Sequence, residues 1–498
     1  MNIKHVKTLA FYLSVIFVFY ACSSSESTVV VVEDAPTTEQ AAQADTVDDQ
    51  FTEITIGLID SVSNFDPLFA ENLSTQRTLS LIYEGLYTLD RNGNPIPAIA
   101  RDVEISEDSL QYVFTLNENK FFHNSSIFTA GVGRRVIASD VKQAFERTAK
   151  NTVPEKAAQL LMGVSGFENY FLEQRAVYDS GKRVLDGVGG IQVLNRQTVA
   201  TILKEKDPDF LKKLASPYLF IYPQEAIGNS NRPLANNPVG TGNYLLTRVQ
   251  SSGQIVLSRD ERRNTTGNQA PAINRINLIN YVDESGLFHG FTNGQVDWIP
   301  EIGPAISEQV ISEEEEVREG YEENIEGEIN FNLVKNNAAR IVAFYLNDRA
   351  TINQDWLINR LAYLTTEDFI TRGEMMLYVD DFEITEEAEP REQYYASYTE
   401  DSFARQLLTE LHNIIFMPQS SLVLFDIRVP TKQTSIYSRN SSSLHEALDP
   451  LDSDYWMRLD TKILGLYKDH VTGIEPTTVP WLLHIDEIRV RNSTAAVQ

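Results

Sequence analysis

Residues 82–116 read IYEGLYTLDRNGNPIPAIARDVEISEDSLQYVFTL and contain the pattern that decides the fold. Gly85 ends a helix-like apolar stripe that begins at Leu73, and a short apolar run follows it. Gly93 to Pro97 predicts a turn, because glycine and proline supply the backbone angles that a turn needs. Residues 112–116 alternate apolar and polar side chains, which predicts a strand.

The same alternation of strands and helices continues on both sides of this stretch. Residues 54–58 predict a first strand, and PVGTGNY at 238–244 predicts a sharp turn that feeds a strand. The strands expected at 276–281 and 342–346 are each followed by a helix, at 284–293 and 354–364. Strands alternating with helices indicate an α/β sheet.

The N-terminus has the composition of a secretion signal. Lys4 and Lys7 precede an apolar run at 9–21, and Cys22, the one cysteine of the chain, follows directly. We therefore expect a lipoprotein signal peptide over 1–21, with lipid attached to Cys22. The alternative is a plain signal peptide with a bystander cysteine, which Phe19 and Tyr20 favour because they depart from the usual bacterial lipobox. Residues 22–50 are predicted to be an acidic, disordered tether.

Composition excludes several classes of function. The net charge of −28 disfavours binding to nucleic acid, which needs an excess of lysine and arginine. The seven histidines form no zinc motif, and the acidic run at 313–316 lacks the spacing of a calcium loop, so we expect no metal and no cofactor. No catalytic constellation is evident, and an exported hydrolase is disfavoured because nucleophile, base and oxyanion turn cannot be assembled. We predict that the chain is not an enzyme.

Several motifs, in their order along the chain, resemble the family 5 extracellular solute-binding proteins over residues 51–370. They are NFDPL at 64–68, the stretch 82–116, KFFHNSS at 120–126, IASDVKQAFER at 137–147, NPVGTGNYLL at 237–246, FTNGQVDWIP at 291–300 and LNDRATINQDWLINRLAYL at 346–364. The resemblance thins beyond residue 370, where the second lobe is shorter than usual, and returns at DEIRV, residues 486–490.

The resemblance implies an α/β, two-lobed periplasmic-binding-protein fold of type II, with a ligand cleft between the lobes and a hinge of two chain crossovers. Lobe I is expected over 51–275, with an inserted subdomain at about 80–185. A shortened lobe II is expected over 276–470, and residues 471–498 return to lobe I. Such proteins bind a solute by closing around it.

The function implied is that of a lipid-anchored substrate-binding protein of an ABC importer. It captures di- to oligopeptides outside the cytoplasm and delivers them to permease subunits in the inner membrane. We expect a monomer in the periplasm or on the cell surface, anchored to a bacterial membrane through its lipid. The alternative is a degenerate binding fold that acts as a surface scaffold or sensory binding protein, which the shortened lobe II favours.

Three stretches are candidates for contact with the ligand. The first loop offers backbone amides and polar groups, the second offers arginines that can bind a carboxylate, and the third ends a predicted strand of lobe II. Each also has a plain structural interpretation, as an ordinary turn, as solvated loop charges and as core. The candidates are Ser63, Asn64, Phe65 and Asp66 in the first stretch, Asp260, Arg262 and Arg263 in the second, and Tyr345 and Asn347 in the third.

Overall fold

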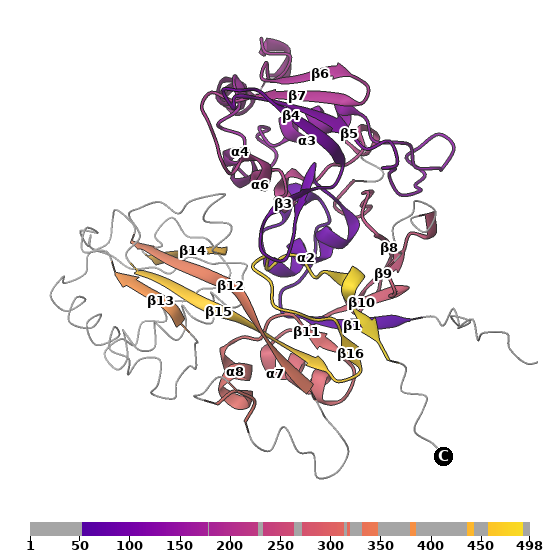
Figure 1. Cartoon of the computed structure of the whole chain (residues 1–498), viewed down its shortest axis with the longest axis vertical. Coiled ribbons are helices and arrows are strands. Elements are labelled where there is room, and N and C mark those ends of the chain that lie inside the picture. The colour runs from indigo at the N-terminus through magenta and orange to yellow at the C-terminus, as the bar shows by residue number, and fades with distance from the viewer. Residues whose placement is uncertain are drawn as a thin grey trace, which may run out of the picture. The chain divides into compact units, whose positions relative to one another are not determined.

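The computed structural model describes residues 52–177, 179–227, 233–262, 271–312, 316–318, 331–346, 379–384, 436–442 and 457–491 (Figure 1). Within these ranges, only the backbone is described at 304, 339–346, 379–384, 436–442 and 457–461. The predicted signal peptide, the tether and the helix expected at 354–364 lie outside the described residues.

A sheet of nine strands contains β1 (Glu53–Leu58) near its middle. β1 pairs in parallel with β10 (Arg275–Asn280) on one side and with β11 (Trp298–Ile299) on the other, and the other pairs of the sheet are antiparallel. The predicted strand and helix at 276–293 are confirmed, because β10 leads into α7 (Glu284–Thr292). The strand order is β14, β12, β15, β11, β1, β10, β9 and β8, with β13 paired to β15. Of these, β8 spans Tyr244–Val249 and β9 spans Ile255–Arg259.

Helix α7 approaches β1 closely because residue 57 is glycine. A Cβ atom at Gly57 would lie 2.4 Å from Leu287 Cδ1 and 3.0 Å from Val296 Cγ1, so any larger residue would push the helix away. β10 pairs with β1 along its full length, so the predicted lobe boundary after residue 275 falls at the start of a strand of this sheet. The division into lobes stays a prediction.

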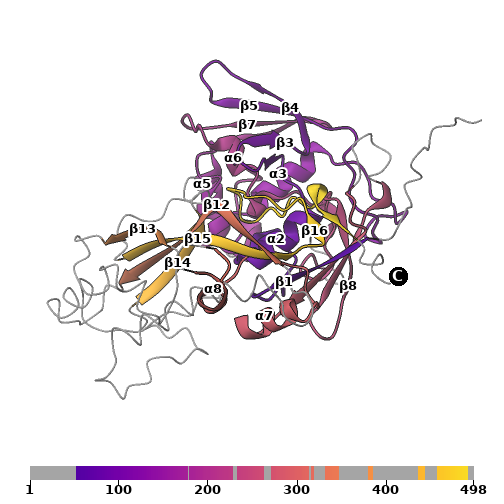
Figure 2. The same cartoon turned by 60° about the horizontal axis from the view of Figure 1, so that its bottom comes forward.

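Two long strands, together with two shorter ones, form the part of this sheet that lies beyond β11. β12 (Phe331–Leu346) and β15 (Met457–Lys468) pair with each other, and Figure 2 shows them running side by side toward β13 (Val379–Ile384) and β14 (Ile436–Ser442). The pairing register shifts between Lys335 and Ala339, which marks a β-bulge in β12. The chain therefore crosses between the two ends of the sheet twice, and one crossing is irregular.

A separate four-stranded antiparallel sheet has the order β4, β5, β7, β6. Residues 191–194 and 198–203 predict paired strands across a short turn, and the structure confirms them as β6 (Ile191–Asn195) and β7 (Thr198–Ile202). Helix α3 (Ala138–Arg147) packs against both strands. The Asp140 carboxylate caps α3 by accepting a hydrogen bond from the Ile137 amide at 3.0 Å. The other two strands are β4 (Ala100–Ile105), at one edge of the sheet, and β5 (Gln111–Leu116), which lies between β4 and β7.

The C-terminal segment packs into the core formed by the earlier part of the chain. Val479 and Trp481 are fully buried in the cluster that also contains Leu79 and Ile82 of α2. The two short strands β16 (Val471–Thr472) and β17 (Arg489–Val490) pair with each other. The remaining elements are α2 (Leu73–Ile82), β2 (Tyr87–Leu89), β3 (Pro95–Pro97), α4 (Lys156–Gln159), α5 (Phe167–Ala176), α6 (Phe210–Lys213), α8 (Pro304–Val310) and short 3-10 turns at Pro67–Phe69, Ser180–Lys182, Pro217–Leu219, Gln224–Ala226 and Ile485–Glu487.

Candidate functional site

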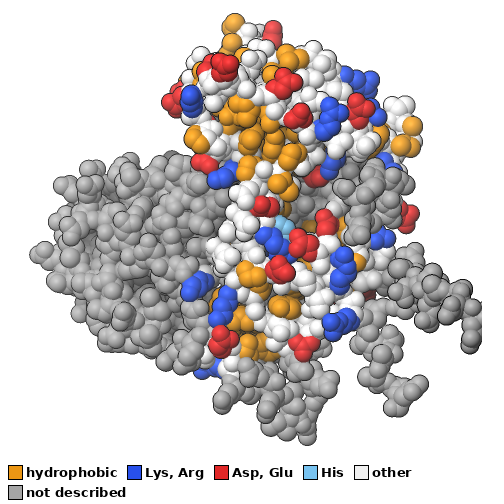
Figure 3. Space-filling model, viewed as in Figure 1, with side chains coloured by type: hydrophobic (Ala, Val, Ile, Leu, Met, Phe, Trp, Pro, Cys, Tyr) orange, Lys and Arg blue, Asp and Glu red, His pale blue; other side chains and the backbone are white. Residues whose placement is uncertain are grey.

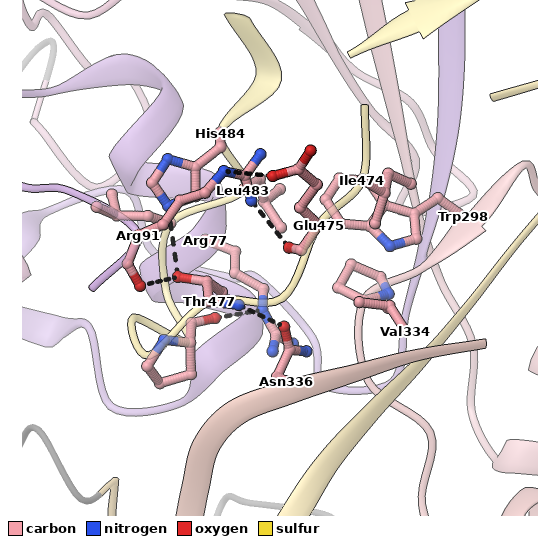
Figure 4. A pocket seen from close by; sticks show the side chains of 13 residues that line it. Arg77, Arg91, Trp298, Val334, Asn336, Ile474, Glu475, Thr477, Leu483 and His484 are labelled. Atoms are coloured by element: carbon pink, nitrogen blue, oxygen red, sulfur yellow. Dashed lines mark hydrogen bonds and ion pairs between the residues drawn. The ribbon is translucent and has the colours of Figure 1, made fainter. Parts of the chain in front are cut away.

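A small cavity lies beside the irregular part of β12, and we call it the junction cavity (Figure 4). Its volume is about 30 Å³, which is enough for a water molecule or a single polar group. Its walls come from α2, β11, β12 and the C-terminal segment. The lining residues include Arg77, Arg91, Trp298, Pro300, Val334, Asn336, Glu475, Thr477, Pro480 and His484.

A buried ion pair joins α2 to the segment after β11. Arg77 Nη1 lies 3.1 Å from Glu301 Oε2, and the two side chains are 4% and 9% exposed. Arg77 Nε also donates a hydrogen bond to the Pro480 carbonyl at 2.9 Å, which adds the C-terminal segment to the same cluster. Helix α2 holds Arg77 in place, because the Asn72 side chain caps its first turn by accepting from the Thr75 amide at 2.7 Å. Removing either charge would break a buried ion pair, which costs more than the loss of an exposed one.

The bulge of β12 is tied to the C-terminal segment by one side chain. Asn336, which lies between the shifted residues Lys335 and Ala339, accepts a hydrogen bond from the Thr477 amide at 3.2 Å. The irregular point of the crossing is thus bonded to the segment that Arg77 also contacts.

Arg91 holds the C-terminal segment from the other side. Its guanidinium donates to Glu487 Oε2 at 3.0 and 2.7 Å, to the Glu475 carbonyl at 2.8 Å and to the Gly473 carbonyl at 3.3 Å. Burial, together with the nearby charge of Arg91, lowers the pKa of His484 to about 4. His484 is therefore neutral at pH 7.

One polar group faces the junction cavity without a partner among the described residues. Trp298 Nε1 is buried, it makes no hydrogen bond within the described part of the chain, and Figure 4 shows the ring beside Ile474 and Val334. An indole N–H donates only, so a water or a carbonyl oxygen suits this position. The cavity can accept one such group, and it cannot enclose a peptide as it stands.

The predicted first-loop residues are engaged in local structure. Asn64 Oδ1 accepts from the Asp66 amide at 2.9 Å, and the buried Phe65 donates its amide to the Ala235 carbonyl at 3.0 Å. Asp66 forms an ion pair with Arg147, with one contact from Arg147 Nη1 at 2.8 Å. Ser63 is exposed. Neither described cavity includes these four residues, so their contact with a ligand stays a prediction.

The second predicted stretch forms its own ion pair. Asp260 accepts from Arg262 Nε at 3.2 Å and Nη2 at 3.0 Å, and Arg262 Nη2 also donates to the Phe122 carbonyl at 2.8 Å. Arg263 and Asn347 lie outside the described residues, and Tyr345 lies in β12 where only the backbone is described. Cys22 also lies outside them. The roles of the three stretches stay predictions.

The predicted sharp turn at 238–244 is explained by a close approach to α2. A Cβ atom at Gly240 would lie 2.0 Å from the Ile82 carbonyl oxygen, and one at Gly242 would lie 2.4 Å from that of Leu81. His123 fixes the turn, because its ring nitrogens lie 2.8 Å from the Gly242 carbonyl and 3.4 Å from the Gly240 amide. This turn positions α2, which carries Arg77.

Other classes of site find no support in the described ranges. They contain no group of three or more His, Cys, Asp or Glu side chains placed to hold a metal ion. None of the described helices has the length and apolar character that a membrane span requires.

Comparison with protein families identifies the chain. Residues 94–357, more than half of the chain, match the model described as "Bacterial extracellular solute-binding proteins, family 5 Middle". The chain belongs to the family 5 bacterial extracellular solute-binding proteins, whose members bind solutes.

A curated relative and two solved structures agree with this family. The dipeptide-binding protein DppE of Bacillus subtilis is 27% identical over 201 residues, which cover 40% of this chain and 34% of that protein. The match therefore spans about a third of the relative's length. The periplasmic binding protein DppA of Helicobacter pylori, solved with peptide STSA, has a TM-score of 0.62 at 12% identity and covers 89% of this chain and 99% of that one. The murein tripeptide binding protein MppA of Escherichia coli has a TM-score of 0.63 at 10% identity, with the same coverage.

The structural likenesses establish the fold. The predicted α/β, two-lobed periplasmic-binding-protein architecture is confirmed, as is the resemblance to family 5. The sequence did not predict the junction residues, because Arg77, Glu301, Asn336 and Thr477 come from four distant parts of the chain. One signal was present: Arg77 lies in an otherwise uncharged helix, LSTQRTLSLI, so its partner had to come from elsewhere.

Proposed function

We propose that the chain is the solute-binding component of an ABC importer and that it captures di- to oligopeptides outside the cytoplasm. The observation that carries the proposal is the double crossing of β12 and β15 in a member of a solute-binding family. Relatives and structural neighbours named for peptide binding support peptides as the ligand class. ABC permease subunits in the inner membrane are the proposed receivers.

The proposed mechanism is closure of the two ends of the long sheet around the peptide. The β12 bulge at residues 335–339 supplies the flexible point, because ladder hydrogen bonds are interrupted there. Asn336 and the Arg77–Glu301 ion pair hold this point against the rest of the protein. A peptide that contacts both ends stabilises the closed arrangement by its differential affinity for it. No covalent step is required, and we propose no enzymatic activity.

The proposal also covers delivery to the cell envelope. Cys22 follows an apolar segment and is the acceptor that we propose for a lipid anchor. A lipid at this position, followed by the tether of residues 22–50, would hold the folded part close to a permease in the membrane.

The test is a thermal-shift screen of the full-length protein against pooled di- to octapeptides, with pools of sugars and nickel chelates for comparison. A ligand that binds the folded state alone raises the melting temperature by mass action. We expect a saturable rise with one or more peptide pools, and with no sugar pool. If only sugars or nickel chelates raise the melting temperature, peptides are not the ligand class, and the class that raises it takes their place in the proposal.

A second function is favoured by one observation. The junction is filled by the chain's own side chains, which leave a cavity of only about 30 Å³. A degenerate binding fold that serves as a surface scaffold or sensory partner would retain such a filled junction. The two functions differ in the screen, because the scaffold predicts no melting-temperature rise from any pool in a folded protein.

A further inference from the structure

A second cavity, of about 550 Å³, lies between the end of α2, the β2–β3 hairpin and residues 482–487. This volume falls within the 300–1,000 Å³ that is typical of small-molecule sites. Arg91, Leu482, Leu483 and His484 line both this cavity and the junction cavity, so they form the wall between the two. None of the described residues within 276–470 lines the larger cavity, so the described lining does not include β12.

The wall of this cavity carries an excess of negative charge. Its lining includes four carboxylates, those of Glu84, Asp90, Asp486 and Glu487, and one guanidinium, that of Arg91. Lys120, which is not among the lining residues, pairs with Glu84 at 2.5 Å, so three carboxylates and one guanidinium remain. Arg91 is already bonded to Glu487 and to two backbone carbonyls. In Figure 3 acidic side chains gather beside a histidine on this face of the protein, below an apolar area that begins near β3.

Asp90 and Asp486 are the two carboxylates of this wall that form no ion pair within the described part of the chain, and Asp486 is the one whose pKa is raised. It accepts hydrogen bonds from the Asn243 amide group at 3.0 and 3.2 Å, and the described residues place no lysine or arginine in an ion pair with it. Asp486 is solvent-exposed, yet desolvation raises its pKa. The charges of Glu84 and Glu487 also raise it, against the opposing effects of the Asn243 hydrogen bond and the Lys120 charge. A side chain in an open cavity can contact solvent and still be partly desolvated by the surrounding walls. A bound cation would relieve this repulsion.

The shape and the apolar lining select the kind of cation. Ile96 is 42% exposed at the rim, and Leu482 and the buried rings of Phe220 and Tyr244 contribute apolar surface. The described carboxylates are too dispersed to form a metal cluster. A ligand with one small cationic group and an apolar body would match both the carboxylates and the apolar lining.

We propose that this cavity is a second binding site, which takes a small organic amine with an apolar body and pairs its ammonium group with Asp486. The site is separate from the proposed peptide site, so the two proposals stand or fall independently. The ammonium group donates to the Asp486 carboxylate, while the body lies against Ile96 and Leu482. Charge-assisted hydrogen bonds of this kind are the strong ones.

The test is titration calorimetry of the full-length protein with phenethylamine and cadaverine, and with phenethyl alcohol as the uncharged match. We expect saturable binding of an amine and at least tenfold weaker binding of the alcohol. Asp486→Asn keeps the size of the side chain and removes its charge, so it should weaken amine binding about tenfold or more. Glu308→Gln is the matched control, because Glu308 is an exposed carboxylate on α8 that lines neither cavity, and it should leave amine binding unchanged.

Three results would overturn the proposal. They are the absence of heat with both amines, equal affinity for phenethylamine and phenethyl alcohol, and unchanged amine affinity in Asp486→Asn with a wild-type melting temperature. Amine binding that a saturating peptide displaces competitively would assign the amine to the peptide site and also overturn it. Failure of peptide binding with intact amine binding would contradict only the importer function.

Discussion

Arg77 and Glu301, 224 positions apart in the chain, form an ion pair at 3.1 Å in the protein interior. The pair joins α2 to the segment that follows β11, and the Pro480 carbonyl bonds to the same guanidinium. Three parts of the chain therefore depend on one charge pair. The predictions below begin with this relationship.

Neutralising one member of the pair should destabilise the protein strongly. Arg77→Met or Glu301→Gln breaks this buried ion pair and should lower the free energy of unfolding by about 3 to 5 kcal/mol. The double variant Arg77→Met with Glu301→Leu should recover much of this loss. Urea unfolding measures the effect, and Lys204→Ala, which breaks an exposed pair with Glu168, should cost less than about 1 kcal/mol. Equal losses in the buried and the exposed pair would contradict the assignment.

The stability should depend on pH through Glu284. Burial raises the pKa of Glu284 from 4.5 to about 7, and the Ile306 amide donates to its carboxylate at 3.0 Å. The folded state therefore binds more protons than the unfolded state between pH 4.5 and 7, so its stability falls as the pH rises through this window. The expected loss is on the order of 3 kcal/mol.

Glu284→Gln should remove this dependence. We expect the variant to match the wild type near pH 4.5 and to exceed it in stability above pH 7, as measured by denaturant unfolding at each pH. Glu308→Gln, which changes an exposed carboxylate on α8, should follow the wild-type curve. Parallel curves for the wild type and Glu284→Gln would show that Glu284 titrates normally.

The turn at 238–244 should not tolerate a side chain. Gly240→Ala places a Cβ 2.0 Å from the Ile82 carbonyl oxygen and should lower the free energy of unfolding by about 1 to 3 kcal/mol, by forcing α2 away. Gly189→Ala is the matched control, because a Cβ there has no atom within 4 Å. A chemical-denaturation comparison of the two variants decides the point, and an unaffected Gly240→Ala protein would refute the close approach.

Lipidation should depend on Cys22. Cys22→Ser removes the thiol and should release the protein from membranes into the soluble fraction of the cell envelope. Fractionation, with mass spectrometry of the N-terminus, measures the change. A wild-type chain that lacks lipid at Cys22 would favour the plain signal peptide instead.

Local patterns in the sequence predicted many of the elements, because each depends on neighbouring residues. The period of 191–203 predicted the β6–β7 hairpin, and the clustered glycines at 240 and 242 predicted the sharp turn. Ser139 and Asp140 predict the start of a helix, whereas α3 begins at Ala138 and the Asp140 carboxylate accepts a hydrogen bond from the Ile137 amide before it. Boundaries of this kind depend on a single hydrogen bond that the sequence pattern does not reveal.

The sites were harder to predict, because they depend on contacts between distant segments. Asp66 and Arg147 lie in two of the motifs that carry the family resemblance, yet their ion pair appears only in the structure. The prediction that Asp66 contacts a ligand rested on its loop alone and did not include the Arg147 guanidinium, which pairs with it. The second cavity was also invisible in the sequence, because Asp486 and Asn243 lie 243 positions apart.

Small-angle X-ray scattering of the full-length protein through a peptide titration tests the central claim most directly. If β12 and β15 carry a hinge, a stabilising peptide should lower the radius of gyration in a saturable way, and removal of the peptide should restore it. A peptide that binds with one-to-one stoichiometry while the radius of gyration stays constant would contradict closure about the two crossings.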